Sequence, residues 1–250
     1  MKVTHLLMGM PITIEVIDSQ VQFSEIEDVF EYFKYVDNKF STYKSTSEIS
    51  RINRGDVISS GYSKDMDTIL NLCEDTKLET DGYFDIVKND NSLDPSGLVK
   101  GWAIKNAAGL LKDKGFNNYY VDAGGDVQIA GLNDKGNPWQ VGIRNPFNRY
   151  ENIKILSLSD IGIATSGTSI RGQHIYNPKR RDAQLDDIVS LTVIGPDVYE
   201  ADRFATAAFS MQRKGILFLD NLKHFAAYMI DHNGIATFTQ NFTDYVSPNV

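Results

Sequence analysis

Cysteine is almost absent from this sequence, since Cys73 is the only one. A single cysteine forms neither an internal disulfide nor a thiolate metal cluster, so packing alone must hold the fold together. Continuous apolar runs are also missing. Polar or turn-forming residues interrupt the apolar start of the chain, and no later segment has the length of a membrane span. We therefore expect a cytoplasmic protein without a membrane span, unless an export segment has been removed.

Positive charge is also in short supply, with 25 Lys and Arg against 33 Asp and Glu and a formal net charge of -8. Phosphate backbones and anionic membrane surfaces attract clustered Lys and Arg, so the composition excludes a general nucleic-acid or membrane-surface binder. A local basic pocket stays possible. Hydrophobic residues make up 42% of the 250 positions, which suffices for a substantial core. We expect one compact domain over residues 1–250.

The first third of the chain contains clear periodic patterns. Alternating apolar and polar residues predict a strand at 11–18, and apolar residues at helical spacing predict helices at 23–41 and 63–82. Between them, residues 41–56 are rich in Ser and Thr, whose side chains bond to nearby backbone groups. We expect turns rather than regular structure there.

The second half of the chain is dominated by strand-like runs punctuated by glycine. The predicted strand regions are 118–131, 138–146, 152–167 and 187–197, followed by a helix at 200–211 and a hairpin at 224–241 that turns at Asn233 and Gly234. Locally paired strands interleaved with few helices predict an α+β fold with antiparallel sheets and packed helices.

The stretch "LDPSGLVKG" starts a predicted helix that is closed by Gly115. Backbone amides at a helix start attract anions, Lys100 adds a positive charge, and Gly97 allows a ligand to approach the backbone. A phosphate site is one interpretation, and a capped helix with a surface lysine is an equally good one. The pattern is neither a Walker loop nor the dinucleotide pattern GxGxxG.

Asp202 and Thr206 stand four residues apart on a predicted helix, so their side chains project from one face. Carboxylate and hydroxyl oxygens are ligands that suit magnesium. Spacing alone favours a simpler reading, in which a solvated Asp sits beside a Thr that bonds back to its own helix.

Two loop features carry possible chemistry. Gly124 and Gly125 in "AGGD" interrupt a strand pattern, which is typical of a bulge or of a ligand that crosses the backbone. Arg171 and His174 lie in a loop between glycines. Histidine suits proton transfer near neutral pH, although a single loop histidine is more often a surface residue.

Taken together, these segments resemble the ApbE family, the FAD:protein FMN transferases, over nearly the whole chain. The resemblance implies a T-fold-like, ApbE-like arrangement of antiparallel sheets and helices. Eight motifs follow the family's order: "MGM", "FSTYKSTSEISRIN", "DGYFDI", "LDPSGLVKGWA", "VDAGGDVQIAG", "WQVGIRNP", "IATSGTSIRGQHIYNP" and "EADRFATAAF".

The resemblance implies roles for individual residues. Asp94 and Lys100 match family positions that contact FAD, while the Gly97 carbonyl, Asp202 and Thr206 match its magnesium ligands. This match outweighs the simpler reading of the Asp202 and Thr206 pair. The remaining matched flavin-contacting positions are Met8, Tyr43, Tyr83, Phe84, Asp85 and His174.

The chain also departs from the family pattern. Only eight residues separate Asp85 from Asp94, where the family commonly has a longer insert. Asn177 stands where an acid is usual, and Arg180 and Arg181 stand near the usual Thr-Gly. The sequence shows neither the signal segment nor the lipid-bearing cysteine of exported family members.

The resemblance implies an enzyme that uses Mg²⁺ to transfer FMN from FAD to a Ser or Thr hydroxyl of an acceptor protein, releasing AMP. Asp202 and His174 are the expected catalytic residues, with His174 as the base. One alternative is an FAD pyrophosphatase that gives FMN and AMP, because the short segment between Asp85 and Asp94 admits solvent. The other is a non-catalytic flavin-binding module.

Overall fold

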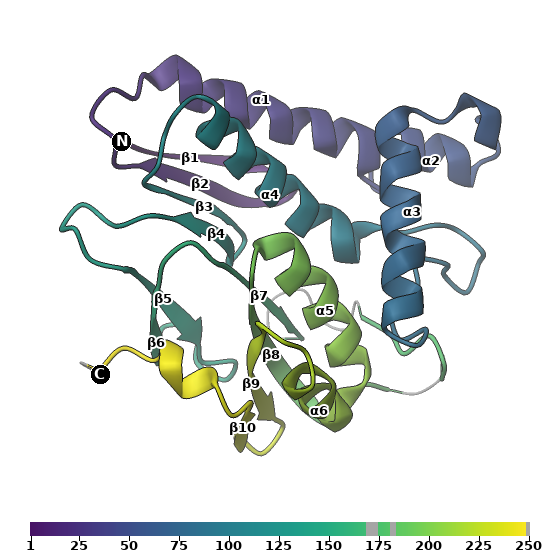
Figure 1. Cartoon of the computed structure of the whole chain (residues 1–250). Helices are drawn as coiled ribbons and strands as arrows, with labels where there is room; N and C mark the ends of the chain where they lie inside the picture. Colours follow the sequence, from purple (N-terminus) through teal and green to yellow (C-terminus); the bar gives the residue numbers. More distant parts are fainter. Residues whose placement is uncertain (169–174, 181–183, 249–250) are drawn as a thin grey trace.

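The computed structural model describes residues 1–168, 175–180 and 184–248. Its centre is an eight-stranded sheet in which each strand runs antiparallel to its neighbours (Figure 1). The order across the sheet is β1 (Lys2–Leu7), β2 (Met10–Val16), β3 (Tyr119–Ala123), β4 (Asp126–Ala130), β7 (Gly162–Gly167), β8 (Ile188–Gly195), β9 (Ala226–Asp231) and β10 (Ala236–Phe238).

A second sheet consists of the antiparallel pair β5 (Trp139–Arg144) and β6 (Asn152–Leu158). It covers one face of the large sheet, and the helices cover the other. Neighbouring residues of β7 contribute to opposite faces of the large sheet. Ile163 packs with the small sheet, and Ala164 packs with the helices. This alternation follows from the two-residue period of a strand and gives the molecule two apolar layers.

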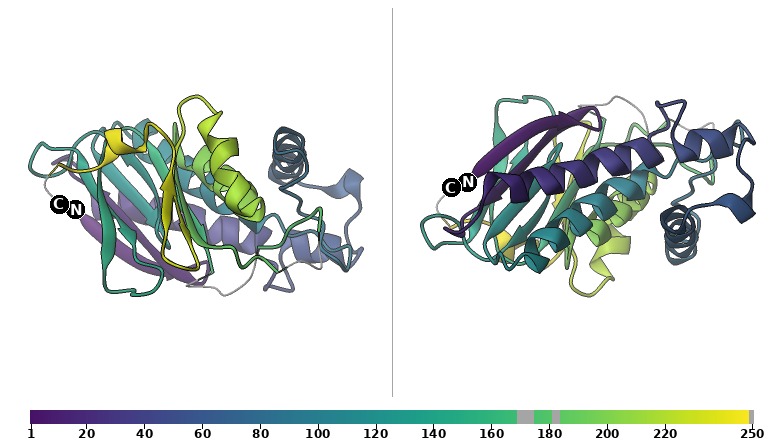
Figure 2. Two further views of the ribbon diagram at one scale, coloured as in Figure 1. Left: turned by 90° about the horizontal axis from the view of Figure 1, so that it is seen from below. Right: turned by 90° about the horizontal axis from the view of Figure 1, so that it is seen from above.

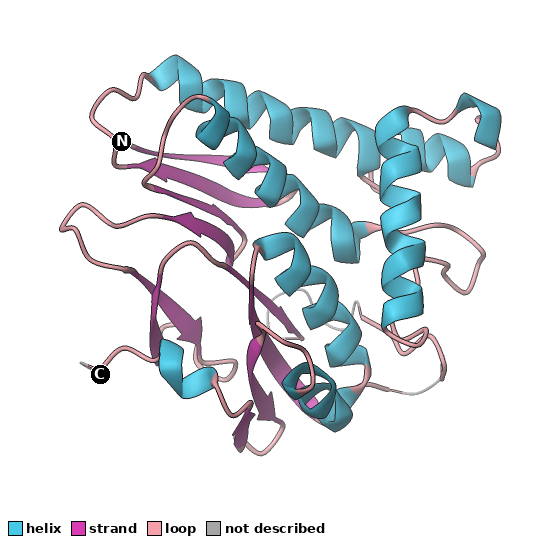
Figure 3. Cartoon of the chain, in the orientation of Figure 1, coloured by secondary structure: helices cyan, strands magenta, loops and turns pink. Residues whose placement is uncertain are grey.

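The helices gather on the other face of the large sheet (Figures 1 and 3). Figure 2 shows α1 and α4 side by side, and α2 and α3 lie beyond one end of the sheet in both of its views. Within the described part of the chain, no helix combines the length and apolar character needed to cross a bilayer. The bounds are α1 (Phe23–Phe40), α2 (Glu48–Asn53), α3 (Lys64–Glu79), α4 (Ser96–Asp113), α5 (Val198–Ser210) and α6 (Gly215–Asp220).

Helix α1 shows why the periodic pattern predicts structure well here. Ile26, Val29, Phe30 and Phe33 recur at helical spacing, and all four are fully buried. Glu25, the third residue of the helix, caps the first turn by accepting a hydrogen bond from Gln22 N at 2.9 Å. The predicted helix at 23–41 is therefore confirmed, together with its buried face.

The prediction of irregular structure throughout residues 41–56 is wrong, because this segment contains α2. The Ser47 hydroxyl caps the helix by accepting a hydrogen bond from Ser50 N at 3.1 Å, and it donates to Ser41 O at 2.7 Å. Ile49 is fully buried in the core, and Ile52 packs against it. The serines thus start and anchor a short helix whose apolar face makes tertiary contacts.

The start of α5 sits directly on β7. A Cβ added to Gly162 would lie only 1.9 Å from Val198 N and 2.0 Å from Asp197 C, so only glycine allows this approach. The Gln128 side chain from β4 accepts a hydrogen bond from Val198 N at 2.9 Å, while Asp197 caps the helix by accepting from Glu200 N. Sheet and helix are fixed to each other at this point.

The predicted C-terminal hairpin is confirmed. β9 and β10 pair antiparallel, and the turn contains Asn233 and Gly234, with Gly234 at a φ of +79°. Asp231 Oδ1 closes the turn by accepting hydrogen bonds from Asn233 N and Ile235 N, both at 2.9 Å. Glycine is favoured here because other residues rarely adopt positive φ.

Cys73 faces the core from α3 with 3% of its surface exposed, and burial raises the pKa of its thiol to about 12. Since the thiolate is the reactive form, we expect no reaction of the native protein with a thiol reagent at about pH 8, and stoichiometric reaction in denaturant. Absorbance of the released thiolate from Ellman's reagent measures both. Fast reaction in native buffer would contradict the packing of α3.

Candidate active site

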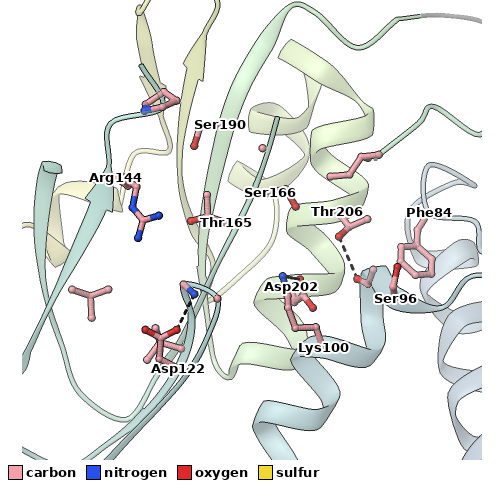
Figure 4. Close-up of a pocket in the computed structure, with 18 of the residues that line it drawn as sticks. Phe84, Ser96, Lys100, Asp122, Arg144, Thr165, Ser166, Ser190, Asp202 and Thr206 are labelled. Carbon is pink, nitrogen blue, oxygen red and sulfur yellow. Dashed lines mark hydrogen bonds and ion pairs between the residues drawn. The ribbon is translucent and has the colours of Figure 1, made fainter. Parts of the chain in front are cut away.

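A cavity of about 390 Å³ lies where the start of α4 and the middle of α5 meet the ends of several strands. It bends around the tip of the β3–β4 hairpin, so that it reaches both faces of the large sheet. Figure 4 shows Lys100, Asp202 and Thr206 on one side, and Asp122 and Arg144 on the other. Eight of the predicted site residues line it: Tyr83, Phe84, Asp85, Asp94, Gly97, Lys100, Asp202 and Thr206.

Three oxygen-bearing groups that could bind a metal ion come together between α4 and α5. Thr206 Oγ1 donates a hydrogen bond to Gly97 O at 3.2 Å, which places the hydroxyl and the carbonyl side by side. One turn away, Asp202 Oδ2 accepts from Gly101 N at 2.7 Å. The sequence spacing of Asp202 and Thr206 thus corresponds to a shared face that is buried against a second helix.

Two glycines of α4 make this close approach possible. A Cβ at Gly101 would lie 2.7 Å from Asp202 Cβ and 2.8 Å from Val198 O. A Cβ at Gly97 would lie 3.0 Å from Thr206 Cγ2 and 3.5 Å from Thr206 Oγ1. Side chains at these positions would push the helices apart and separate the donors.

Lys100 lies between two buried carboxylates. Its ammonium forms an ion pair with Asp126 and lies 3.4 Å from Asp202 Oδ1. Asp126 also accepts a hydrogen bond from Thr165 N at 2.9 Å through its other oxygen. Asp126 was not predicted as a site residue, although the motif "AGGD" contains it, because only the fold places this strand beside α4.

Burial dominates the ionisation of Asp202, which is 3% exposed. Removal from water raises the pKa of its carboxyl well above the ordinary range, and the neighbouring Asp126 raises it further. The Lys100 ammonium and the Gly101 amide act in the opposite direction. Two carboxylates therefore share this one ammonium at a buried place, and an additional cation would favour the ionised form of Asp202.

The donor set fits Mg²⁺. The described residues contain no group of three or more His, Cys, Asp or Glu side chains placed to hold a metal ion, so a cation here must use hydroxyl and carbonyl oxygens as well. Asp202, Thr206 Oγ1 and Gly97 O supply such hard oxygens, which suit magnesium with its remaining positions open to water or phosphate. The glycine at position 97 keeps the space beside Thr206 free of a side chain.

The segment Tyr83–Asp85 forms the wall of the cavity beside α3. Asp85 pairs with Lys77 of α3, with Nζ and Oδ2 3.0 Å apart, and it also accepts a hydrogen bond from Val87 N at 3.0 Å. The aromatic rings of Tyr83 and Phe84 line the same wall. These two rings give the wall an aromatic surface that suits an aromatic ring system.

The structure does not bring every predicted site residue to the cavity. Met8 sits at the β1–β2 turn with a φ of 51°, and the Tyr43 side chain is 98% exposed; neither lines the cavity. His174 and Arg181 lie outside the described residues. The flavin-contacting roles of Met8, Tyr43 and His174 stay predictions.

Asp122 and Arg144 line the far part of the cavity and were missed by the sequence analysis. Burial raises the pKa of the Asp122 carboxyl. The hydrogen bond that Asp122 accepts from Gly125 N, at 2.8 Å, lowers this pKa. Strand alternation was the available signal, since Tyr120 packs with the small sheet and Asp122 must face the same way. The two glycines between β3 and β4 form a turn with positive φ at both residues, rather than a bulge.

Asn177 has a structural role in place of the acid that the resemblance implies. Its side-chain oxygen accepts hydrogen bonds from Lys179 N at 2.9 Å and Arg180 N at 3.2 Å, which closes a turn. An Asp would accept the same two bonds, so the turn does not require the charge.

Several known proteins are similar in sequence to this chain. A family model described as "ApbE family" matches residues 8–90 and 86–229. A protein of Vibrio cholerae named FAD:protein FMN transferase is 32% identical over 128 residues, covering 48% of this chain and 38% of that protein. One of Haemophilus influenzae with the same name is 24% identical, covering 84% of this chain and 80% of that protein. The chain thus spans less than half of some relatives that it matches.

Solved structures show the same fold. The flavin transferase ApbE from Vibrio cholerae has a TM-score of 0.85 at 21% identity, covering 98% of both chains. The ApbE protein from Thermotoga maritima has a TM-score of 0.86 at 21% identity, covering 99% of both. The predicted α+β architecture with antiparallel sheets is confirmed.

Proposed function

The chain belongs to the ApbE family, and on that premise we propose that it transfers FMN from FAD to a Ser or Thr hydroxyl of an acceptor protein and releases AMP. The observation that carries the proposal is the meeting of Gly97 O, Asp202 and Thr206 Oγ1 beside Lys100 in one cavity. The net charge of -8 supports a protein acceptor rather than a nucleic acid.

The reaction breaks the bond between the FMN phosphorus and the bridging oxygen of the pyrophosphate, and that oxygen leaves with AMP. The acceptor hydroxyl loses its proton and forms the new P–O bond. Gly97 O, Asp202 and Thr206 Oγ1 would hold Mg²⁺, which when bound polarises phosphoryl oxygens. His174 remains the proposed acceptor of the hydroxyl proton.

Lys100 would neutralise charge on the pyrophosphate. Asp126 holds the Lys100 ammonium at the cavity wall through an ion pair, so the lysine would stay oriented if Asp202 bound a metal. The amides in the first turn of α4 add fixed partial positive charge near the same place. Such groups stabilise negative charge at the reacting phosphate because they are already in position.

The direct test combines two measurements on the purified protein with FAD and Mg²⁺. Covalent flavin fluorescence in a denaturing gel reports transfer to a total protein extract from the source cells. Chromatography of nucleotides without the extract reports FMN and AMP. Fluorescent acceptor bands that require Mg²⁺ support the proposal, and FAD that stays intact in both arms refutes it.

Hydrolysis of FAD is the second candidate function, because the segment between Asp85 and Asp94, which follows the wall Tyr83–Asp85, is short. Residues 86–94 form a tight hairpin in which Val87 bridges Leu93 and Asp94 N donates to Ile86 O at 2.8 Å. Such a short segment leaves the rim of the cavity close to solvent. FMN and AMP formed at the same rate with and without acceptor protein would favour this function.

We expect Lys100→Ala to weaken FAD binding far more than riboflavin binding, because riboflavin carries no phosphate for the ammonium to contact. Fluorescence titration of both flavins gives the ratio of the two losses, which does not depend on the fraction of folded protein. Lys112→Ala, an exposed lysine at the end of the same helix, is the matched control. Equal losses for both flavins would assign Lys100 to the stability of α4 and α5 instead.

His174→Asn is expected to slow FMN transfer by roughly 100-fold or more, the scale of a lost general base, while FAD affinity falls only modestly. Single-turnover transfer at saturating FAD isolates the chemical step from binding and release. An unchanged rate would remove His174 from the mechanism.

A further inference from the structure

The short hairpin at residues 86–94 is held to the rest of the protein from two sides. On one side, Asn53 at the end of α2 exchanges two hydrogen bonds with Leu93, at 2.8 and 2.9 Å. On the other side, the Tyr176 hydroxyl lies 2.8 Å from Asp85 O and 3.1 Å from Val87 O. Asp85 is the last residue of the cavity wall, and Val87 lies in the hairpin that follows it directly.

Tyr176 and its neighbours also line the cavity. Ile175, Tyr176 and Pro178 face the space that Tyr83, Phe84 and Asp85 face from the opposite segment. The Tyr176 hydroxyl therefore links two cavity walls that are about ninety residues apart in sequence, through the main-chain carbonyls of Asp85 and Val87.

Two further contacts join the same segments. The Lys179 ammonium lies over the Tyr83 ring, 4.5 Å from its centre, and pairs with Asp81. Lys179 and Asp81 are both exposed, so their ion pair contributes little by itself. The half-buried Tyr176 bond is the stronger link.

We infer that Tyr176 is a positioning residue that keeps the wall Tyr83–Asp85 closed against solvent, and that it thereby decides how FMN is divided between a protein hydroxyl and water. The inference rests on the proposed function. Both routes break the same bond to the AMP oxygen; in one the acceptor oxygen binds phosphorus, and in the other a water oxygen does, with its proton lost to solvent. Closing a site against water prevents this competing hydrolysis.

Tyr176→Phe tests the inference, because it keeps the ring and removes only the oxygen. The ratio of FMN hydrolysed to FMN transferred is expected to rise about fivefold, the factor that one net hydrogen bond is worth. The dissociation constant for FAD is expected to rise by a similar factor. The urea midpoint stays unchanged, because only a local segment opens.

Tyr150→Phe is the matched control, since that hydroxyl contacts only Arg149 among the described residues, on the exposed β5–β6 loop. Lys179→Met is a second variant of the same link, with a smaller change expected in the same direction. A Tyr176→Phe protein with the wild-type product ratio and the wild-type FAD affinity overturns the inference. A wild-type protein that binds FAD and leaves it intact would refute the proposed function, and the affinity change would still test Tyr176.

Discussion

Asp202→Asn is expected to reduce Mg²⁺-dependent FMN transfer by about a thousandfold or more. The substitution removes the formal charge from the proposed metal ligands, and stabilisation by a metal is worth several kcal/mol, at about 1.4 kcal/mol for each factor of ten. The amide retains the size of the carboxylate and an oxygen that can accept from Gly101 N. The contact between α4 and α5 therefore survives, and the loss is chemical rather than structural.

Two measurements separate the possible outcomes for Asp202→Asn. Transfer is measured as a function of Mg²⁺, and thermal unfolding is followed with and without Mg²⁺, because an ion that binds the native state raises the midpoint. We expect the wild-type midpoint to rise and the variant midpoint to stay constant. Asp134→Asn, at an exposed position before β5, controls for net charge. Normal Mg²⁺-dependent turnover in Asp202→Asn would refute the metal assignment.

Gly162→Ala is expected to cause the largest loss of stability, at least about 3 kcal/mol, at the upper end of the cost of overpacking. The added carbon would lie within 2.0 Å of backbone atoms of Asp197 and Val198, which cannot rotate away as a side chain would. The first turn of α5 must move, and it carries Asp202 with it. A loss of this size is a large share of the free energy of unfolding, which is usually about 5–15 kcal/mol.

Urea denaturation of Gly162→Ala measures the loss, and the reactivity of Cys73 gives an independent record of unfolding. Gly109→Ala is the matched control, because a Cβ there meets no heavy atom within 4 Å. Alanine is the better helix former, so that control is expected to gain up to about 1 kcal/mol. A Gly162→Ala protein as stable as the wild type would mean that α5 does not rest on β7 as described.

The fold was predictable where one local signal dominated. The apolar spacing of Ile26, Val29, Phe30 and Phe33 leaves no alternative to a buried helix face, and Asn233–Gly234 favours a tight turn. Helix α2 was not predictable, because Ser and Thr density favours turns and caps alike. Only tertiary packing of Ile49 decides between them.

The site was predictable in part, for a comparable reason. Helical spacing places Asp202 and Thr206 on one face, but the partner carbonyl of Gly97 comes from another helix. Spacing alone favoured a solvated Asp and a Thr bonded to its own helix, whereas Asp202 is buried and Thr206 bonds to α4. The role of Asp126 was not predictable without the fold, because nothing in the local sequence indicates that its carboxylate contacts Lys100.

The contact between α4 and α5 also has a consequence for the timing of synthesis. Gly101 and Asp202 are 101 residues apart in the chain. At about 5–20 residues per second, a ribosome adds Gly101 about 5 to 20 seconds before it adds Asp202. During that interval the glycine face of α4 has no partner helix, and the proposed magnesium site lacks two of its three ligands. Magnesium thus cannot assist early folding, and a nascent chain arrested before residue 198 is expected to be as sensitive to protease with Mg²⁺ as without it.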